Sequence, residues 1–190
     1  MKVLDCVSEV AHILGDSEME SVINGDGELS QEQRKLKARY IAGLNIAVDT
    51  IASRYYTSVR EIKVVSDSDQ RIDYSALASR VYEVVSVREA NGGEGVDYYT
   101  LPFCLYVPCA KKEYFVKFKF LPEKCEGFDD EVELLPFVSP RAVVYLMISD
   151  ILLSKNIYDE SKFWFSKFES EMTQAVSSRR MRTLKVSKII

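Results

Sequence analysis

Histidine is almost missing from the sequence: its 190 residues contain a single one, His12. A Ser-His-Asp triad therefore has no other histidine to use, and a multi-histidine metal centre cannot form. The four cysteines, Cys6, Cys104, Cys109 and Cys125, include no Cys-x-x-Cys pair of the kind that holds zinc. These absences predict a protein that has no metal or cofactor and is not an enzyme.

Long apolar runs are also missing. The longest, residues 142–153, contains Asp150 and falls short of the roughly 20 residues that cross a bilayer. The first 14 residues mix Asp5, Glu9 and His12 into apolar positions, which is unlike a signal peptide. We therefore expect no membrane partner, and we expect synthesis in a reducing compartment where cysteines stay as thiols.

Proline and glycine are scarce, at five and eight residues, whereas 47% of the chain is hydrophobic and 28% is charged. This composition excludes a disordered or collagen-like chain and is typical of a protein with a packed core. The length fits one domain with an appendage. We expect a single domain over residues 1–176 and a basic C-terminal arm over residues 177–190.

The net charge of −4 conceals an uneven distribution along the chain. Residues 1–33 hold eight acids and one base, whereas residues 177–190 hold five bases and no acid. The chain is therefore acidic at one end and basic at the other. This polarity favours docking between unlike surfaces, and the basic end is also compatible with a local nucleic-acid contact.

Helical periodicity and capping signals occur towards both ends of the chain. Ser30 followed by Gln33 matches a capping box, in which each side chain satisfies the other residue's backbone N–H. Ser139 before Pro140 matches a helix start, because proline at the first helical position loses no helical hydrogen bond. With apolar residues at steps of three and four, these signals predict helices over residues 1–14, 30–57, 140–155 and 159–176. Between the first two we expect a loop with no more than about one helical turn.

In the middle of the chain the period changes from 3.6 to 2, which predicts strands within residues 62–135. Residues 114–120 alternate aromatic and aliphatic side chains with lysines, so one face of that strand should be buried. The glycine-rich segment 91–95 precedes a second alternating run at 101–107, which predicts a hairpin. A last short strand is expected at 131–135. The expected fold class is α+β, a helical bundle of N-terminal and C-terminal helices with a central antiparallel β insertion.

Two charged clusters leave other functions open. Asp129, Asp130, Glu131 and Glu133 have the ligand chemistry of a metal-dependent hydrolase, although adjacent acids in a loop usually form a solvated face. The basic arm is compatible with a solvated end, with the arm of a DNA-binding accessory protein, or with a segment that becomes ordered on a partner. Its aliphatic side chains favour the partner, because a solvated tail gains nothing from exposing them.

Two stretches of the chain resemble a known family. Residues 114–122 read Tyr-Phe-Val-Lys-Phe-Lys-Phe-Leu-Pro, and residues 134–140 read Leu-Leu-Pro-Phe-Val-Ser-Pro before a helical hairpin with an aromatic end. Together with the long helix that precedes the β region, this layout resembles the head-to-tail adaptor, or connector, proteins of tailed bacteriophages and prophages, of the tail tubular A type. The resemblance covers residues 30–176.

The resemblance implies a structural virion protein of the neck, made in the bacterial cytoplasm before assembly. It implies a ring, often of twelve subunits, that joins the portal protein to the downstream tail protein and lets DNA pass without reading its sequence. The C-terminal arm would dock on the portal through Arg179, Arg180, Arg182, Lys185, Lys188, Ile189 and Ile190. The loop facing the tail would consist of Asn91, Gly92, Gly93, Glu94 and Gly95.

Overall fold

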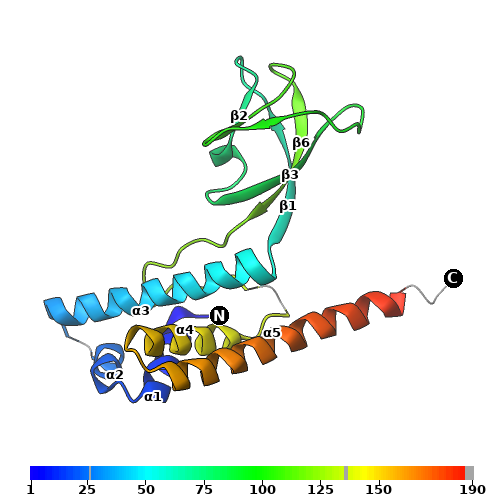
Figure 1. Cartoon of the computed structure of the whole chain (residues 1–190). Coiled ribbons are helices and arrows are strands. Elements are labelled where there is room, and N and C mark those ends of the chain that lie inside the picture. The colour runs from blue at the N-terminus through cyan, green and yellow to red at the C-terminus, as the bar shows by residue number, and fades with distance from the viewer. Residues whose placement is uncertain (26, 135–136, 187–190) are drawn as a thin grey trace. The chain divides into compact units, whose positions relative to one another are not determined.

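The computed structural model describes residues 1–25, 27–134 and 137–186, and it has the expected α+β fold (Figure 1). The chain divides into two compact units. The helical unit comprises Met1–Ile51 and Lys124–Ile190, and the β unit comprises Ala52–Glu123. Both ends of the chain thus build one unit, and the β unit is inserted between them, where the sequence predicted one domain with a β insertion.

The helical unit begins with α1 (Val3–Leu14), which starts two residues later than predicted and ends at the predicted residue. Gly15 caps it in the left-handed region, at φ +61°, where glycine has no steric penalty. The segment predicted next, a loop with no more than about one helical turn, contains a longer helix, α2 (Ser17–Asn24). The Asp16 carboxylate accepts the backbone N–H of Met19 at 3.0 Å and so caps α2, whose buried face anchors the helix.

The long helix α3 (Gln31–Thr50) confirms the capping box. Gln33 N–H donates to Ser30 Oγ at 3.2 Å, and Ser30 N–H donates to Gln33 Oε1 at 3.0 Å. The helix was predicted to run to residue 57, but its last turn changes to a five-residue π-helix, η1 (Ile51–Tyr55), before the first strand. In a π-helix each backbone hydrogen bond spans five residues instead of four. Such single turns are found mostly within α-helices.

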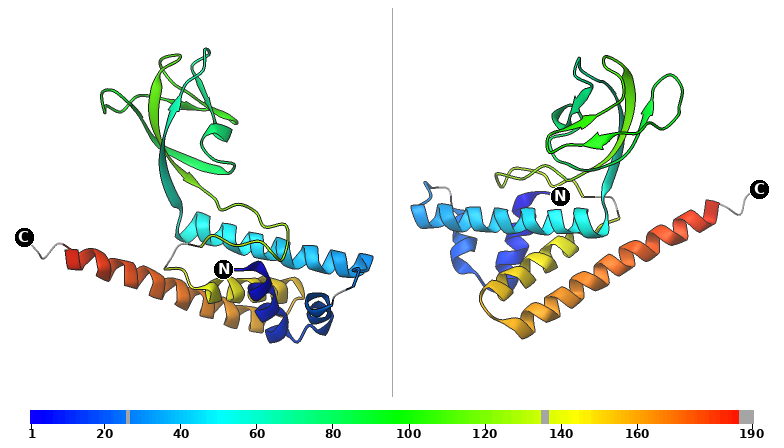
Figure 2. Two further views of the ribbon diagram at one scale, coloured as in Figure 1. Left: turned by 180° about the vertical axis from the view of Figure 1, so that it is seen from behind. Right: turned by 45° about the horizontal axis from the view of Figure 1, so that its top comes forward.

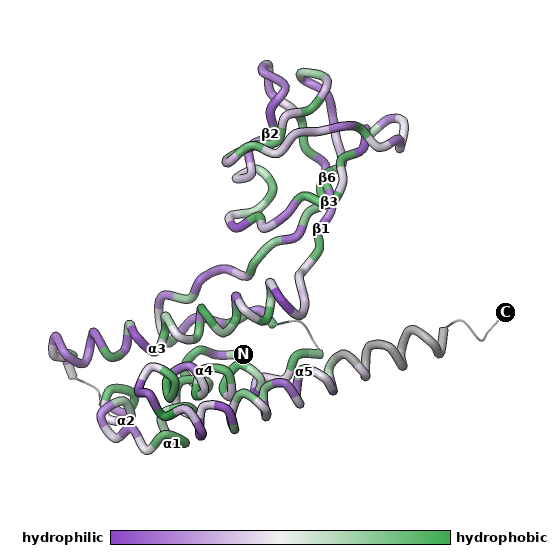
Figure 3. Tube along the Cα trace, viewed as in Figure 1, coloured by the Kyte–Doolittle hydropathy of each residue, from purple (hydrophilic) through white to green (hydrophobic). Residues whose placement is uncertain are grey.

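Helix α4 (Pro140–Ser154) is the core of the helical unit. It packs against α1, α3 and α5 (Tyr158–Val186), and its apolar character is visible along the tube in Figure 3. Ser139 caps it by accepting the N–H of Arg141 at 3.2 Å, which confirms the predicted start. Apolar side chains cover most of its circumference because it has neighbours on several sides.

Helix α5 is longer than predicted. The sequence placed its end at residue 176 because basic residues follow, but the helical backbone continues to Val186. Residues 177–186 contain no glycine or proline and are rich in arginine, which is a good helix former. A helix of 29 residues is about 43 Å long, and the 15 residues of α4 span about 22 Å. In Figures 1 and 2, the C-terminal half of α5 accordingly continues beyond the N-terminal end of α4.

The β unit contains a three-stranded antiparallel sheet in the order β1-β6-β3, formed by β1 (Ser58–Val65), β6 (Glu113–Phe120) and β3 (Val81–Glu89). The central strand β6 confirms the alternation predicted from the sequence. Tyr114, Val116 and Phe118 on its inner face are 0% exposed. They form the core of the unit.

A second small sheet has the order β2-β5-β4 and consists of β2 (Arg71–Asp73), β5 (Cys104–Tyr106) and β4 (Tyr99–Thr100), with the 3-10 turn η2 (Tyr74–Ala76) after β2. The predicted strand over 101–107 is therefore shorter, and it pairs with β2 and β4, not with β3. A turn separates β4 from β5. In it, Leu101 N–H donates a hydrogen bond to the carbonyl of Cys104 at 2.9 Å. This turn ends the alternation that the sequence suggested.

The strand predicted at residues 131–135 is wrong over the part of it that the structure describes. Glu131 forms an isolated antiparallel bridge with Lys2, and Val132 N–H donates to the carbonyl of Met1 at 2.8 Å. The partner segment enters α1 at Val3. The pairing ends there because the chain turns into α1. The first N–H groups of a helix have no partner within it, and those of Val3 and Leu4 donate to the carbonyls of Asp130 and Phe128 at 3.0 and 3.2 Å.

Candidate functional site

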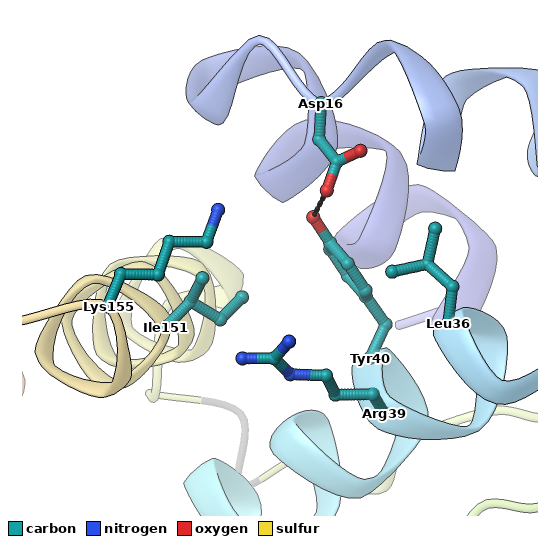
Figure 4. A pocket seen from close by; sticks show the side chains of 6 residues that line it. All are labelled: Asp16, Leu36, Arg39, Tyr40, Ile151 and Lys155. Atoms are coloured by element: carbon teal, nitrogen blue, oxygen red, sulfur yellow. Dashed lines mark hydrogen bonds between the residues drawn. The ribbon is translucent and has the colours of Figure 1, made fainter.

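A small cavity lined by both polar and apolar side chains lies among α2, α3 and α4 in the helical unit (Figure 4). Its volume is about 50 Å³. That is room for water molecules but not for an organic substrate, which needs several hundred Å³. The lining side chains come from the start of α2, from α3 and from the end of α4: Asp16, Leu36, Arg39, Tyr40, Ile151 and Lys155.

The polar groups of this cavity connect helices to one another. The Tyr40 hydroxyl donates to Asp16 Oδ2 at 2.8 Å, while Oδ1 of the same carboxylate caps α2. Burial, and then the hydrogen bond to Asp16, raises the pKa of Tyr40. Across the cavity Arg39 Nη2 donates to Ser154 Oγ at 3.1 Å. The arrangement joins α2, α3 and α4, and its geometry fits a structural role.

We expect Asp16→Ala to destabilise the helical unit by about 2 kcal/mol and Tyr40→Phe by about 1 kcal/mol. The alanine variant loses the cap of α2. It also leaves the hydroxyl of Tyr40, a residue only 4% exposed, without its hydrogen-bond acceptor. The phenylalanine variant loses one hydrogen bond and leaves the cap in place. Urea unfolding followed by Trp164 fluorescence measures both. Equal effects of the two substitutions would contradict this account.

The predicted portal-docking arm belongs to α5 for most of its length. Arg179, Arg180, Arg182 and Lys185 lie in the helical backbone, which ends at Val186. Lys188, Ile189 and Ile190 lie outside the described residues. The arm is therefore a continuation of a packed helix through residue 186, and its role at a portal stays a prediction.

The predicted tail-facing loop is an exposed turn after β3. Its five residues, Asn91, Gly92, Gly93, Glu94 and Gly95, are all exposed. Backbone bonds close the turn: Gly93 N–H donates to the carbonyl of Glu89 at 3.2 Å, and Glu89 N–H donates to the carbonyl of Glu94 at 3.1 Å. Gly93 has φ +71°, a conformation that favours glycine. The structure thus contains the turn, and a contact with a tail protein is untested.

The acids near Asp129 lie at the segment that contacts the start of α1. Asp130 Oδ2 accepts the N–H groups of Glu126 and Gly127 at 2.7 and 2.9 Å, and these bonds hold the pKa of Asp130 below its usual value. Its carbonyl accepts Val3 N–H at 3.0 Å. The neighbouring acids Asp129, Glu131 and Glu133 are exposed. Within the part of the chain that the structure describes, no three His, Cys, Asp or Glu side chains are placed to hold a metal ion.

His12 lies on α1 with its side chain 84% exposed. Its Nδ1 is 3.5 Å from Glu20 on α2. The histidine therefore has a surface position.

Large apolar side chains are exposed on both units, and the sequence did not reveal most of them. On the β unit Phe103 is 83% exposed and Tyr99 is 70% exposed. On α5 Phe163 is 56% exposed, and Lys167 Nζ lies 4.9 Å from its ring centroid and 5.6 Å from that of Trp164. The exposure of Phe103 could have been predicted from the preceding Pro102, because a proline within an alternating run indicates a turn. Exposed aromatic groups of this kind are typical of protein contact surfaces.

Comparison of the sequence with models of known protein families and with curated proteins found no match. Among the helices of residues 1–25, 27–134 and 137–186, none has both the length and the apolar character of a membrane span.

Proposed function

We propose that this protein is a ring-forming head-to-tail adaptor that joins the portal to the tail of a bacteriophage or prophage. The observation that carries the proposal is the α5 helix, which extends past α4 and contains four of the five basic residues of the C-terminal end. We expect another molecule to pack where the α5 backbone continues past α4. Its positive charge and the acidic N-terminal segment supply two unlike surfaces on one subunit.

The exposed aromatic side chains support an assembly role. A ring subunit uses two different complementary patches, because a head-to-tail interface closes by rotation. The helical unit exposes Phe163 and Tyr158, and the β unit exposes Phe103 and Tyr99. Tyrosine and phenylalanine are enriched in the buried centres of interfaces. Each unit therefore offers a candidate contact for a neighbouring subunit or for the portal and the tail protein.

The proposal is tested by measuring the mass of the purified protein alone and mixed with a portal ring. We expect a subunit that assembles on the portal, and we expect deletion of residues 177–190 to weaken that binding by at least about tenfold. The control is a variant with the loop of residues 91–95 shortened to a two-residue turn, which should still bind the portal and lose the tail protein. Failure of the full-length chain to bind any portal of its own phage would contradict the proposal.

Binding and activity measurements on the deletion variant and on two acid variants distinguish the adaptor from the two alternative functions, DNA binding and hydrolysis. A DNA-binding accessory protein would show an affinity for duplex DNA that falls steeply with salt and disappears with residues 177–190. A hydrolase would lose activity on Asp129→Asn and Asp130→Asn, whereas an adaptor with these changes would still assemble. Portal binding that persists in both acid variants, together with weak and unspecific DNA binding, is the result that the adaptor requires.

A further inference from the structure

Strand β1 forms one outer edge of the larger sheet. It pairs with β6 through eight successive residues from Ser58 to Val65 with no irregularity, whereas the opposite edge strand, β3, has two register shifts. Bulges of this kind protect an edge from pairing with another chain. Among the described strands, β6 is the only one that pairs with β1. The regular edge is therefore the one available for a further strand.

The bond made by Ser66, the residue after β1, shows which residues of β1 direct their backbone groups towards β6. Ser66 N–H donates to the carbonyl of Lys112 at 3.0 Å, which extends the register of β1 on β6. Backbone groups alternate sides along a strand, so the even-numbered residues of β1 bond to β6. The odd-numbered residues turn their N–H and C=O groups to the outer edge: Val59, Glu61, Lys63 and Val65.

We propose that β1 pairs antiparallel with β1 of a second copy of this chain, with Ile62 on the two-fold axis. The two sheets then form one continuous six-stranded sheet. The pairing makes an isologous contact, in which each copy contributes the same strand. About eight backbone hydrogen bonds would join the two edges, two for each of the four pairs of outward residues.

Charge selects this register. With Ile62 on the axis, Glu61 lies opposite Lys63 of the second copy and Val59 lies opposite Val65, and symmetry repeats both pairs. A shift of two residues in one direction places Glu61 against Glu61, and a shift in the other places Lys63 against Lys63. A shift of one residue is excluded. It would place the outward N–H and C=O groups of odd-numbered residues opposite even-numbered residues of the second copy, whose backbone groups already bond to β6. Opposite charges directly across a strand pair stabilise it, and like charges destabilise it.

The side chains needed for this pairing are accessible. Glu61 is paired with Arg88 at 3.0 Å and Lys63 with Glu113 at 2.8 Å, yet their side chains are 37% and 49% exposed. Val59 and Val65 are 51% and 59% exposed. A lysine on an edge strand ordinarily discourages pairing. Here it meets a carboxylate in the register just described, so the edge is selective for a copy of itself.

The pairing is tested in the full chain by sedimentation equilibrium. We expect a dimer whose dissociation constant rises at least about tenfold in Glu61→Lys and in Lys63→Glu, because each change opposes two like-charged pairs. The double variant Glu61→Lys/Lys63→Glu should restore the dimer. It keeps the charge clashes that each change creates inside one copy, with Arg88 and with Glu113, so its recovery reports the interface alone. The matched control is Glu83→Lys on β3, which breaks a similar pair with Lys119 and should leave the dimer unchanged.

Hydrogen exchange gives a second readout that depends on register. In the dimer the amides of Val59, Glu61, Lys63 and Val65 should be protected, and in Glu61→Lys they should exchange quickly, while those of the even-numbered residues stay protected by β6. A chain that is monomeric at roughly 100 µM, or one whose double variant fails to recover, would overturn the proposal. The outcome is independent of the adaptor function, since portal binding was assigned to α5.

Discussion

Phe118→Ala is expected to remove about 3–5 kcal/mol from the folding free energy of the β unit. Phe118 is 0% exposed and lies on the central strand β6, opposite Arg60 on β1 and Val84 on β3. The substitution leaves a cavity between two strands that cannot close without moving their hydrogen-bonded partners. A unit of about 70 residues has a total stability of roughly 4–11 kcal/mol, so the loss is comparable with all of it.

Two probes measure this effect in one experiment. The sole tryptophan, Trp164, belongs to α5 in the helical unit, so its fluorescence follows that unit alone. Far-ultraviolet circular dichroism follows both units. We expect Phe118→Ala to produce an early transition in the circular dichroism that Trp164 does not report. Phe103→Ala, at a residue 83% exposed, is the control and should change stability by less than about 0.5 kcal/mol. A Trp164 transition that shifts equally would show that the two units unfold together.

The second large effect is expected for Phe168→Ala, which should cost the helical unit about 3–5 kcal/mol. Phe168 is 0% exposed and belongs to the buried face of α5, which packs against α4 together with Met172. Loss of its ring loosens the helical hairpin. Because α5 also contains Arg179, Arg180, Arg182 and Lys185, the adaptor proposal predicts that portal binding weakens when the hairpin loosens.

The control for this substitution is Phe163→Ala, which removes the same ring from the same helix at a site 56% exposed. It should leave the Trp164 unfolding midpoint nearly unchanged while it removes part of an exposed aromatic surface. A large loss of stability in Phe163→Ala, or none in Phe168→Ala, would contradict the packing described for α5.

Local signals predicted the elements that depend on a few neighbouring residues. The capping box of Ser30 and Gln33 started α3, Ser139 started α4, and the alternation within β6 identified its buried face. Each of these relies on contacts within a turn or on the two-residue period of a strand. The α+β class followed from the order of these elements along the chain.

Only some of the candidate functional features were predictable from the sequence. The exposed turn at residues 91–95 was evident from its glycines, and the basic character of residues 177–190 from composition. The outer edge of β1 was not evident, because which strand lies at an edge depends on the pairing order β1-β6-β3. The cavity among α2, α3 and α4 was also missed, since Asp16 and Tyr40 meet only when α2 and α3 pack together.

The sequence by itself determined the α+β class, the capped starts of α3 and α4 and the polarity of charge between the two ends. The tertiary structure decided that acidic residues after α1 form a helix, that β5 joins β2 and β4, and that β1 lies at the edge of its sheet among the described strands. The physical reason is range: capping and alternation act between neighbours, whereas strand order and helix packing depend on surfaces brought together from distant parts of the chain.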